Sequence, residues 1–261
     1  MDQREQRKAQ VKKQRIILAL VAAVVVIAIV IGCVSCGSCK SKSESTDVTE
    51  VKITKKETTK ETTTKAVNDP KVAIMGECYV EDFEKYCKDL LPKKSLFIYK
   101  VGVLTGALID DKFINYQGNT YTAEERAALY KPDQLFFLVG MNETENDTPQ
   151  ITVKHFDTMI KDIKGVNPKL KAVICSLPPV ARDGLDGYGT NAQIRNYNEK
   201  IKAYCDKTDG VDYLDIRDIM EDESGKLSKE ANPGDGAHWQ ISTTKEVAKR
   251  IKEKSDELKY K

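Results

Sequence analysis

The sequence is poor in histidine and in aromatic residues, and each scarcity excludes a class of site. Only two of its 261 residues are histidines, His155 and His238, and no cysteine pair is spaced with them as a zinc site requires. The sequence therefore predicts no zinc site. Aromatic residues make up 7% of the chain, which offers no surface on which bases would stack.

An excess of charge of one sign is also missing. The chain carries 42 basic and 40 acidic side chains, for a net charge of +2. This balance creates no global field that would attract a polyanion, so we expect no nucleic-acid partner. Internal repeats are absent as well, and the length is sufficient for one sizeable core with appendages.

The cysteines do not form a pattern typical of a disulfide framework. Their number is odd, and they fall into two groups. Three of them, Cys33, Cys36 and Cys39, follow an apolar run near the N-terminus, where Cys33 and Cys36 could pair. The other four, Cys78, Cys87, Cys175 and Cys205, are spread through the body of the chain.

The sequence has one long apolar run, at residues 16–34. It follows a tail, residues 1–15, with six basic and two acidic side chains. Such a pattern predicts a single membrane-spanning helix with the rest of the chain outside the cytoplasm. A cleaved signal is an alternative, and Val30-Ile31-Gly32-Cys33 resembles a bacterial lipobox in which Cys33 would carry lipid. Either anchor places the body on the outer face of the cell membrane.

Residues 35–69 are rich in Ser, Thr, Lys and Glu and poor in apolar side chains. A segment of this composition buries too little apolar surface to offset its chain entropy. We expect a disordered stalk between the membrane and a globular domain at residues 70–261.

From Pro70 onward, short apolar runs alternate with segments of helical periodicity. The predicted strands are 72–75, 96–99, 134–139, 170–175 and 211–216, and the predicted helices are 80–91, 123–130, 151–163, 191–205 and 242–258. Five strand-then-helix units predict an α/β fold: a three-layer domain with a five-stranded parallel sheet and helices on both faces.

Polar residues gather where the predicted strands end. Cys78 follows the first strand on the turn into a helix, and Asn142 follows the strand at 134–139. Gly106 lies beyond the second strand, and Asp235 and His238 lie three residues apart in a loop before the last helix. Because carboxyl ends of parallel strands meet at one edge, where ligands bind, we expect these residues to lie together.

These residues resemble the signature blocks of the SGNH, or GDSL, hydrolases. Gly76-Glu77-Cys78 stands at the place of Gly-Asp-Ser, Gly106 at that of the second-block glycine, and Gly140-Met141-Asn142-Glu143 at that of Gly-x-Asn-Asp. Asp235-x-x-His238 stands at the place of Asp-x-x-His. The similarity covers nearly all of residues 70–258. It implies a flavodoxin-like fold and hydrolysis of carboxylic esters, often acyl or acetyl groups on sugars, without metal or cofactor.

The resemblance also implies a role for each residue. His238 would be the general base, oriented by Asp235, and Cys78 would be the nucleophile. Gly106, Asn142 and the backbone N–H of residue 78 would form the oxyanion hole. The substrate would be an acylated small molecule or glycan.

The chain departs from the family at two positions, with Cys78 in place of serine and Glu77 in place of aspartate. A thiol beside an imidazole can be a nucleophile, but its longer bonds displace the adduct, and Glu77 crowds the same loop. Three hypotheses therefore stay open: an ester hydrolase, a catalytically silent domain that binds a glycan or a protein, and an acyltransferase.

Simpler roles are also available for several of these residues. Cys78 could be a small buried thiol at a strand end, and Asn142 could cap the following turn. We expect Cys87, Cys175 and Cys205 to fill the core. His155 lies beside an apolar helical stripe, which favours packing at the surface or its boundary.

Overall fold

The computed structural model describes residues 69–146 and 148–260. The predicted basic tail, the membrane or signal segment and almost all of the predicted stalk lie outside these residues, as do Cys33, Cys36 and Cys39. Within the described ranges, no helix is both long and apolar enough to cross a membrane.

A five-stranded sheet forms the centre of the described domain. Its strands are β1 (Val72–Gly76), β2 (Ser95–Tyr99), β5 (Gln134–Leu138), β6 (Lys171–Cys175) and β7 (Val211–Leu214). They run in the order β2-β1-β5-β6-β7, and all four neighbouring pairs are parallel. The predicted five-stranded parallel sheet is therefore confirmed.

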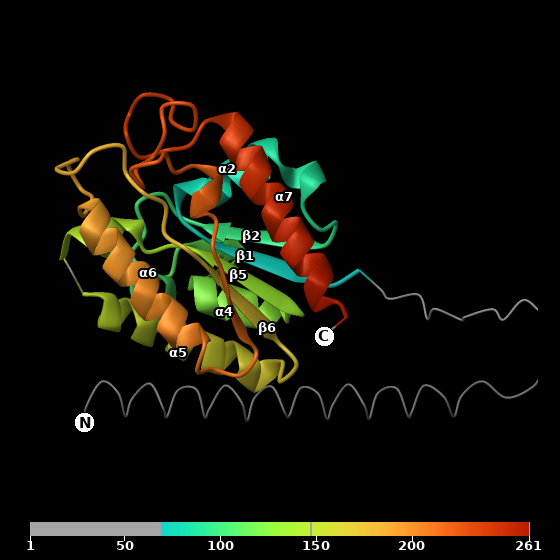
Figure 1. Ribbon diagram of the computed structural model, residues 1–261. Helices are drawn as coiled ribbons and strands as arrows, with labels where there is room; N and C mark the ends of the chain where they lie inside the picture. The colour runs from blue at the N-terminus through green and yellow to red at the C-terminus, as the bar shows by residue number, and fades with distance from the viewer. Residues whose placement is uncertain (1–68, 147, 261) are drawn as a thin grey trace, which may run out of the picture. The chain divides into compact units, whose positions relative to one another are not determined.

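Helices cover both faces of the sheet, so the fold has three layers (Figure 1). The helices α2 (Cys78–Tyr86) and α7 (Ile241–Leu258) pack together over one face. On the other face α4 (Ala123–Tyr130) contacts α5 (Pro149–Val166), which contacts α6 (Asn191–Cys205). The short elements are α3 (Ala107–Asp110) and three 3-10 turns, η1 (Lys88–Leu90), η2 (Met141–Asn146) and η3 (Arg217–Ile219).

The core is built around β1, every residue of which is buried. This explains why the run from Val72 to Met75 shows no alternation, since a strand covered on both faces needs none. Phe137 of β5 packs edge to face against Phe156 of α5, with ring centroids 5.2 Å apart. Cys87, Cys175 and Cys205 are buried, and their prediction as core residues is confirmed.

One local prediction is wrong, and one pair of strands was not predicted. The first helix ends at Tyr86, not at residue 91, and the chain continues as η1 toward Pro92. Because the apolar period continues through η1, periodicity alone could not locate this end. The antiparallel hairpin of β3 (Ile114–Tyr116) and β4 (Asn119–Tyr121) was not predicted. Its strands are only three residues long, and its turn places Gln117 and Gly118 at positive φ, as a two-residue hairpin loop requires.

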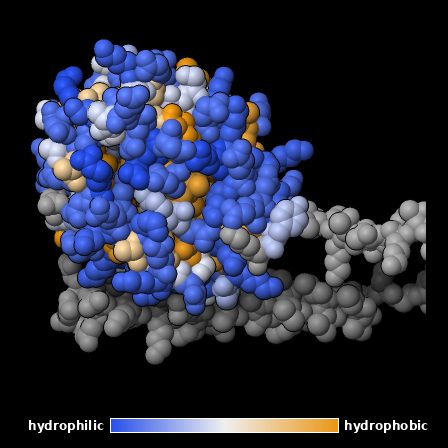
Figure 2. Space-filling model, viewed as in Figure 1, coloured by the Kyte–Doolittle hydropathy of each residue, from blue (hydrophilic) through white to orange (hydrophobic). Residues whose placement is uncertain are grey.

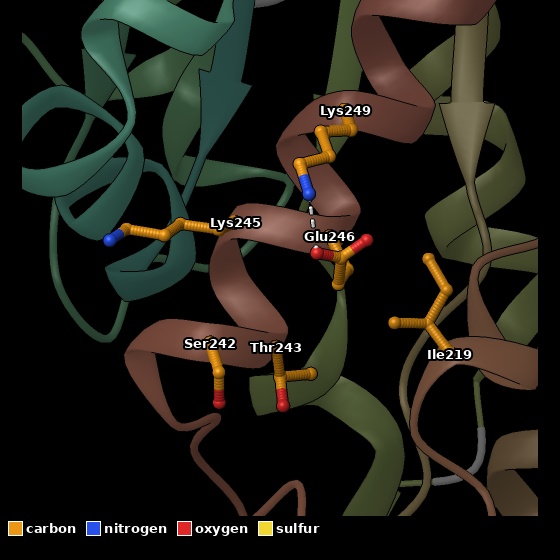
Figure 3. A pocket seen from close by; sticks show the side chains of 6 residues that line it. All are labelled: Ile219, Ser242, Thr243, Lys245, Glu246 and Lys249. Atoms are coloured by element: carbon orange, nitrogen blue, oxygen red, sulfur yellow. Dashed lines mark hydrogen bonds and ion pairs between the residues drawn. The ribbon is translucent and has the colours of Figure 1, made fainter.

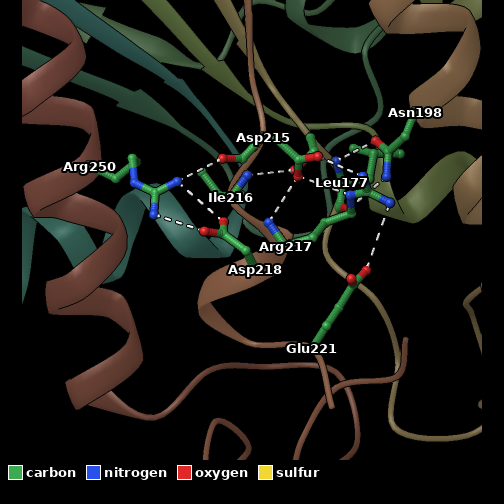
Figure 4. Close-up of polar contacts among 9 residues, drawn as sticks. Leu177, Asn198, Asp215, Ile216, Arg217, Asp218, Glu221 and Arg250 are labelled. Atoms are coloured by element: carbon green, nitrogen blue, oxygen red, sulfur yellow. Dashed lines mark hydrogen bonds and ion pairs between the residues drawn. The ribbon is translucent and has the colours of Figure 1, made fainter. Parts of the chain in front are cut away.

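The chain leaves β7 through a network of charged side chains (Figure 4). Arg217 donates to Asp215 Oδ2 from Nη2 at 2.6 Å, and Ser176 Oγ donates to Asp215 Oδ1 at 3.1 Å. Burial raises the pKa of Asp215, but the hydrogen bonds from Arg217 outweigh it, and the net shift is downward. Arg250 of α7 donates to Asp218 of η3 at 3.0 Å from Nη2. The exit of β7 is thereby tied to the last helix.

The side of the domain drawn in Figure 2 is mostly hydrophilic, with apolar side chains in small separate patches. No large apolar patch is visible on the described residues in this view. Single exposed apolar residues are normal on a protein surface and indicate no binding site by themselves.

Candidate active site

The predicted site residues lie at the carboxyl edge of the sheet, on loops from three neighbouring strands and before α7. Cys78 is the first residue of α2, directly after β1 and Glu77, rather than part of a free turn. Gly106 precedes α3 in the connection after β2, and Asn142 lies in η2 after β5. This edge includes the point between β1 and β5 where the strand order reverses, a common position for a ligand crevice.

Gly76 allows the end of β1 to lie close to the end of β5. A Cβ atom at this position would lie 2.1 Å from the carbonyl oxygen of Leu138. The next residue, Glu77, donates its backbone N–H to the same oxygen at 3.2 Å. Glycine is therefore required here, and the backbone of Glu77 is fixed against the end of β5.

The Asp235–His238 pair is formed. Nδ1 of His238 lies 2.6 Å from Oδ2 of Asp235, while Oδ1 accepts the backbone N–H groups of Ala237 and His238, each at 2.9 Å. Burial raises the pKa of Asp235, but these hydrogen bonds outweigh it and lower the pKa to about 2. Since Asp235 is ionised, the imidazole donates from Nδ1, and Nε2 is left to accept a proton.

The loop that carries this pair docks on the first turn of α2. The ring of Tyr79 stacks on Trp239, with centroids 4.2 Å apart, and the Tyr79 hydroxyl donates to the carbonyl oxygen of Ala237 at 3.3 Å. The rings of Tyr79 and His238 are 6.0 Å apart. His238 therefore lies beside the start of the helix that begins with Cys78. Sequence reasoning did not single out Tyr79 or Trp239, because their contact joins residues distant in the chain.

The Cys78 thiol is half-buried and neutral. Burial raises its pKa to about 12, and the neighbouring carboxyl group of Glu77 adds to the rise. The backbone N–H groups of Tyr79 and Cys78 oppose this effect but are outweighed. Within the described part of the chain, no hydrogen bond joins the Cys78 sulfur to His238. The structure thus places both residues at one rim of the sheet, without a hydrogen bond between them.

Glu77 is buried beneath the same turn, with 1% of its surface exposed. Its Oε1 accepts the backbone N–H of Met141 at 3.2 Å, and its Oε2 accepts the side-chain amide of Asn142. Burial raises the pKa of Glu77 to about 8, and the charge of Glu143 adds to the rise, although the hydrogen bonds from Met141, Gly140 and Asn142 oppose it. Asn142 is therefore bound to Glu77 rather than capping the following turn.

A second polar network supports Gly106. The carboxylate of Glu143 accepts the hydroxyl of Thr105 on Oε1 and that of Thr152 on Oε2, each at 2.6 Å, as well as the Thr105 backbone N–H. Nδ1 of His155 lies 2.7 Å from the Thr105 hydroxyl. A Cβ at Gly106 would lie 3.1 Å from the His155 ring. His155 lies at the boundary of the core, as predicted, but it also packs against this glycine.

Among residues 69–146 and 148–260, no cluster of three or more histidine, cysteine or acidic side chains could hold a metal ion. A surface pocket of about 440 Å³ lies along the start of α7, and Figure 3 shows Lys245, Glu246 and Lys249 on its wall. None of the candidate site residues lines this pocket.

Comparison with sequence families matches residues 103–240 to the GDSL-like Lipase/Acylhydrolase family. The matched range contains Gly106, Asn142, Asp235 and His238 and begins after Cys78. No curated protein matches the chain.

Solved structures share the fold at low sequence identity. A GDSL-like lipase from Bacteroides thetaiotaomicron is 17% identical, with a TM-score of 0.56 over 72% of this chain and 88% of its own. A protein from Streptococcus pneumoniae is 20% identical, with a TM-score of 0.56 over 74% of this chain and 86% of its own. A carbohydrate esterase of family 3 from Talaromyces cellulolyticus is 14% identical, with a TM-score of 0.52 over 72% and 97%. At these identities the likeness establishes the fold alone.

Proposed function

The chain belongs to the GDSL-like lipase/acylhydrolase family, and from this premise we propose that it hydrolyses carboxylic esters, removing acyl or acetyl groups through Cys78, His238 and Asp235. The observation that carries the proposal is the 2.6 Å contact between His238 and the ionised Asp235. A carboxylate held in this way fixes the imidazole tautomer and stabilises the imidazolium that forms during catalysis. This pair is the part of the proposed machinery that is fully assembled.

In the proposed reaction His238 acts in step with the thiol. Nε2 accepts the Cys78 proton while the sulfur attacks the ester carbonyl carbon, and the oxyanion is bound by backbone N–H groups of residues 78 and 106. When the tetrahedral adduct collapses, the alcohol leaves and takes the proton from His238. The acyl group stays on Cys78 as a thioester. Water then attacks the thioester, with His238 again as base, and releases the acid and the thiol. Because burial keeps Cys78 neutral, the base is essential.

The contact between the thiol and His238 would form when substrate binds. Catalytic hydrogen bonds are often long or poorly aligned without substrate and tighten in the reacting complex. His238 is suited to such an adjustment because 40% of its side-chain surface is exposed.

The proposed substrate is an acylated glycan outside the cytoplasm. Support comes from the basic tail and apolar run at residues 1–34, which favour an anchor in the cell membrane, and from a structural neighbour described as a carbohydrate esterase. Protease treatment of intact cells tests the location. Digestion of the domain at residues 70–261 without lysis is expected, and protection until lysis would contradict this location.

Release of 4-nitrophenol from 4-nitrophenyl acetate by the purified full-length chain tests the activity. We expect turnover that falls at least about a hundredfold in His238→Ala and in Asp235→Asn, because both substitutions disable the base. The matched control is Asp206→Asn, at the end of α6, which should retain turnover. Equal rates in the wild type and His238→Ala would refute the proposal, and a product that depends on an added sugar acceptor would indicate acyl transfer.

A second candidate function is a catalytically silent domain that binds a glycan or a protein at the same edge of the sheet. The observation that favours it is the neutral Cys78 thiol without a hydrogen bond to His238. The variant Cys78→Ser separates the two functions. A silent domain would gain turnover from this substitution, whereas a thiol hydrolase would lose most of its activity.

A further inference from the structure

The side-chain amide of Asn142 has two N–H donors, and both are occupied. One donates to Oε2 of Glu77, and the other donates to the carbonyl oxygen of Val103 at 3.2 Å. An asparagine side chain has no further donor. In this arrangement the amide of Asn142 has no hydrogen left for an oxyanion.

Glu77 cannot easily release this amide. Its side chain is 1% exposed, so water does not replace a lost partner, and an unpaired buried carboxyl group is costly. Its backbone is held by the bond from its N–H to Leu138 on β5, and its Oε1 is held by Met141. Because the backbone and Oε1 are both held, the length of the side chain determines how close the carboxyl group lies to Asn142.

We propose that Glu77 is a positioning residue that holds the amide of Asn142 and withholds it from the oxyanion hole. The inference rests on the proposed hydrolase, since it deepens the account of that site. Aspartate at position 77 would withdraw the carboxyl group by about 1.5 Å, the length of one carbon–carbon bond. The shorter side chain would leave one N–H of Asn142 free to turn toward the substrate.

The variant Glu77→Asp tests this role. Removal of one oxyanion donor typically lowers kcat by about 10²–10³, so its recovery should raise kcat substantially. We expect an increase of at least about tenfold in kcat for 4-nitrophenyl acetate, with KM changed by less than about twofold, because the donor acts on the transition state. The matched control is Glu81→Asp, the same substitution one turn along α2, which should leave kcat unchanged.

An NMR measurement tests the contact without relying on turnover. The side-chain amide signal of Asn142, assigned by its loss in Asn142→Ala, should lie downfield in the wild-type chain and move upfield in Glu77→Asp. Glu81→Asp should leave this signal in place.

The outcomes distinguish the inference from the proposed function. An Asn142 signal that is the same in the wild type and Glu77→Asp would overturn the inference, as would a shifted signal with unchanged kcat in a chain that turns over ester. If no variant hydrolyses the ester, the proposed hydrolase fails, and the NMR signal alone decides whether Glu77 holds Asn142.

Discussion

Replacing Glu77 with glutamine should remove a pH dependence of the stability of this domain. Burial raises the pKa of Glu77 from 4.5 to about 8 in the folded chain. Between these values the folded state keeps a proton that the unfolded state has lost, so the free energy of unfolding falls as pH rises. This contribution is most favourable below pH 4.5 and is lost by about pH 8.

The magnitude follows from the size of the shift. Each pKa unit corresponds to about 1.36 kcal/mol, so the full shift corresponds to about 5 kcal/mol. Over the practical range from pH 5 to pH 8, the linkage relation gives a loss of about 3.5 kcal/mol. Because glutamine does not ionise, Glu77→Gln should lack this loss while retaining an oxygen that can accept the N–H of Met141.

Urea unfolding of the wild type and Glu77→Gln at several pH values measures the effect. The variant should gain about 3.5 kcal/mol relative to the wild type between pH 5 and pH 8. The control is Glu81→Gln, which removes a surface carboxylate that pairs with Lys85, and its relative stability should change by less than about 1 kcal/mol. Parallel stability curves for the wild type and Glu77→Gln would refute the assignment of a proton to Glu77.

Two further predictions concern the reactivity of Cys78 and the packing of Phe156. The rate of alkylation of Cys78 by iodoacetamide, measured by mass spectrometry of its peptide, should rise about tenfold per pH unit from pH 7 to pH 10, because the pKa of the thiol is about 12. A plateau near pH 8 would show an activated thiolate. Phe156→Ala should lower the free energy of unfolding by about 3–5 kcal/mol, since Phe156 is fully buried against Phe137. The control Val166→Ala, exposed on the same helix, should cost less than about 0.5 kcal/mol, and equal losses would contradict the packing argument.

The sheet could be predicted because its strands are encoded locally. The run Val72–Met75 is apolar throughout, and a strand buried on both faces requires this composition. The Asp235–His238 pair was also predictable, because the two residues are three positions apart in one loop. The hairpin at residues 114–121 was not, since strands of three residues carry too little periodicity.

The network around the oxyanion residues could not be predicted from the sequence. Glu77 and Asn142 are 65 positions apart, and their contact depends on the register of β1 against β5. The bond between Thr105 and Glu143 likewise joins the loops after β2 and β5. Glu143 stood in the Gly-x-Asn-Asp block, which could have suggested a role, but its partners appear only once the strands are placed side by side.

The stacking of Trp239 on Tyr79 gives the domain an intrinsic optical reporter. Trp239 is the only tryptophan in the chain, and it directly follows His238. Its indole is buried while the loop is docked, so undocking would expose it to water and shift its fluorescence emission to longer wavelength. Ligand binding that moves the loop can therefore be followed in the unlabelled chain, from a signal that originates one residue from the proposed base.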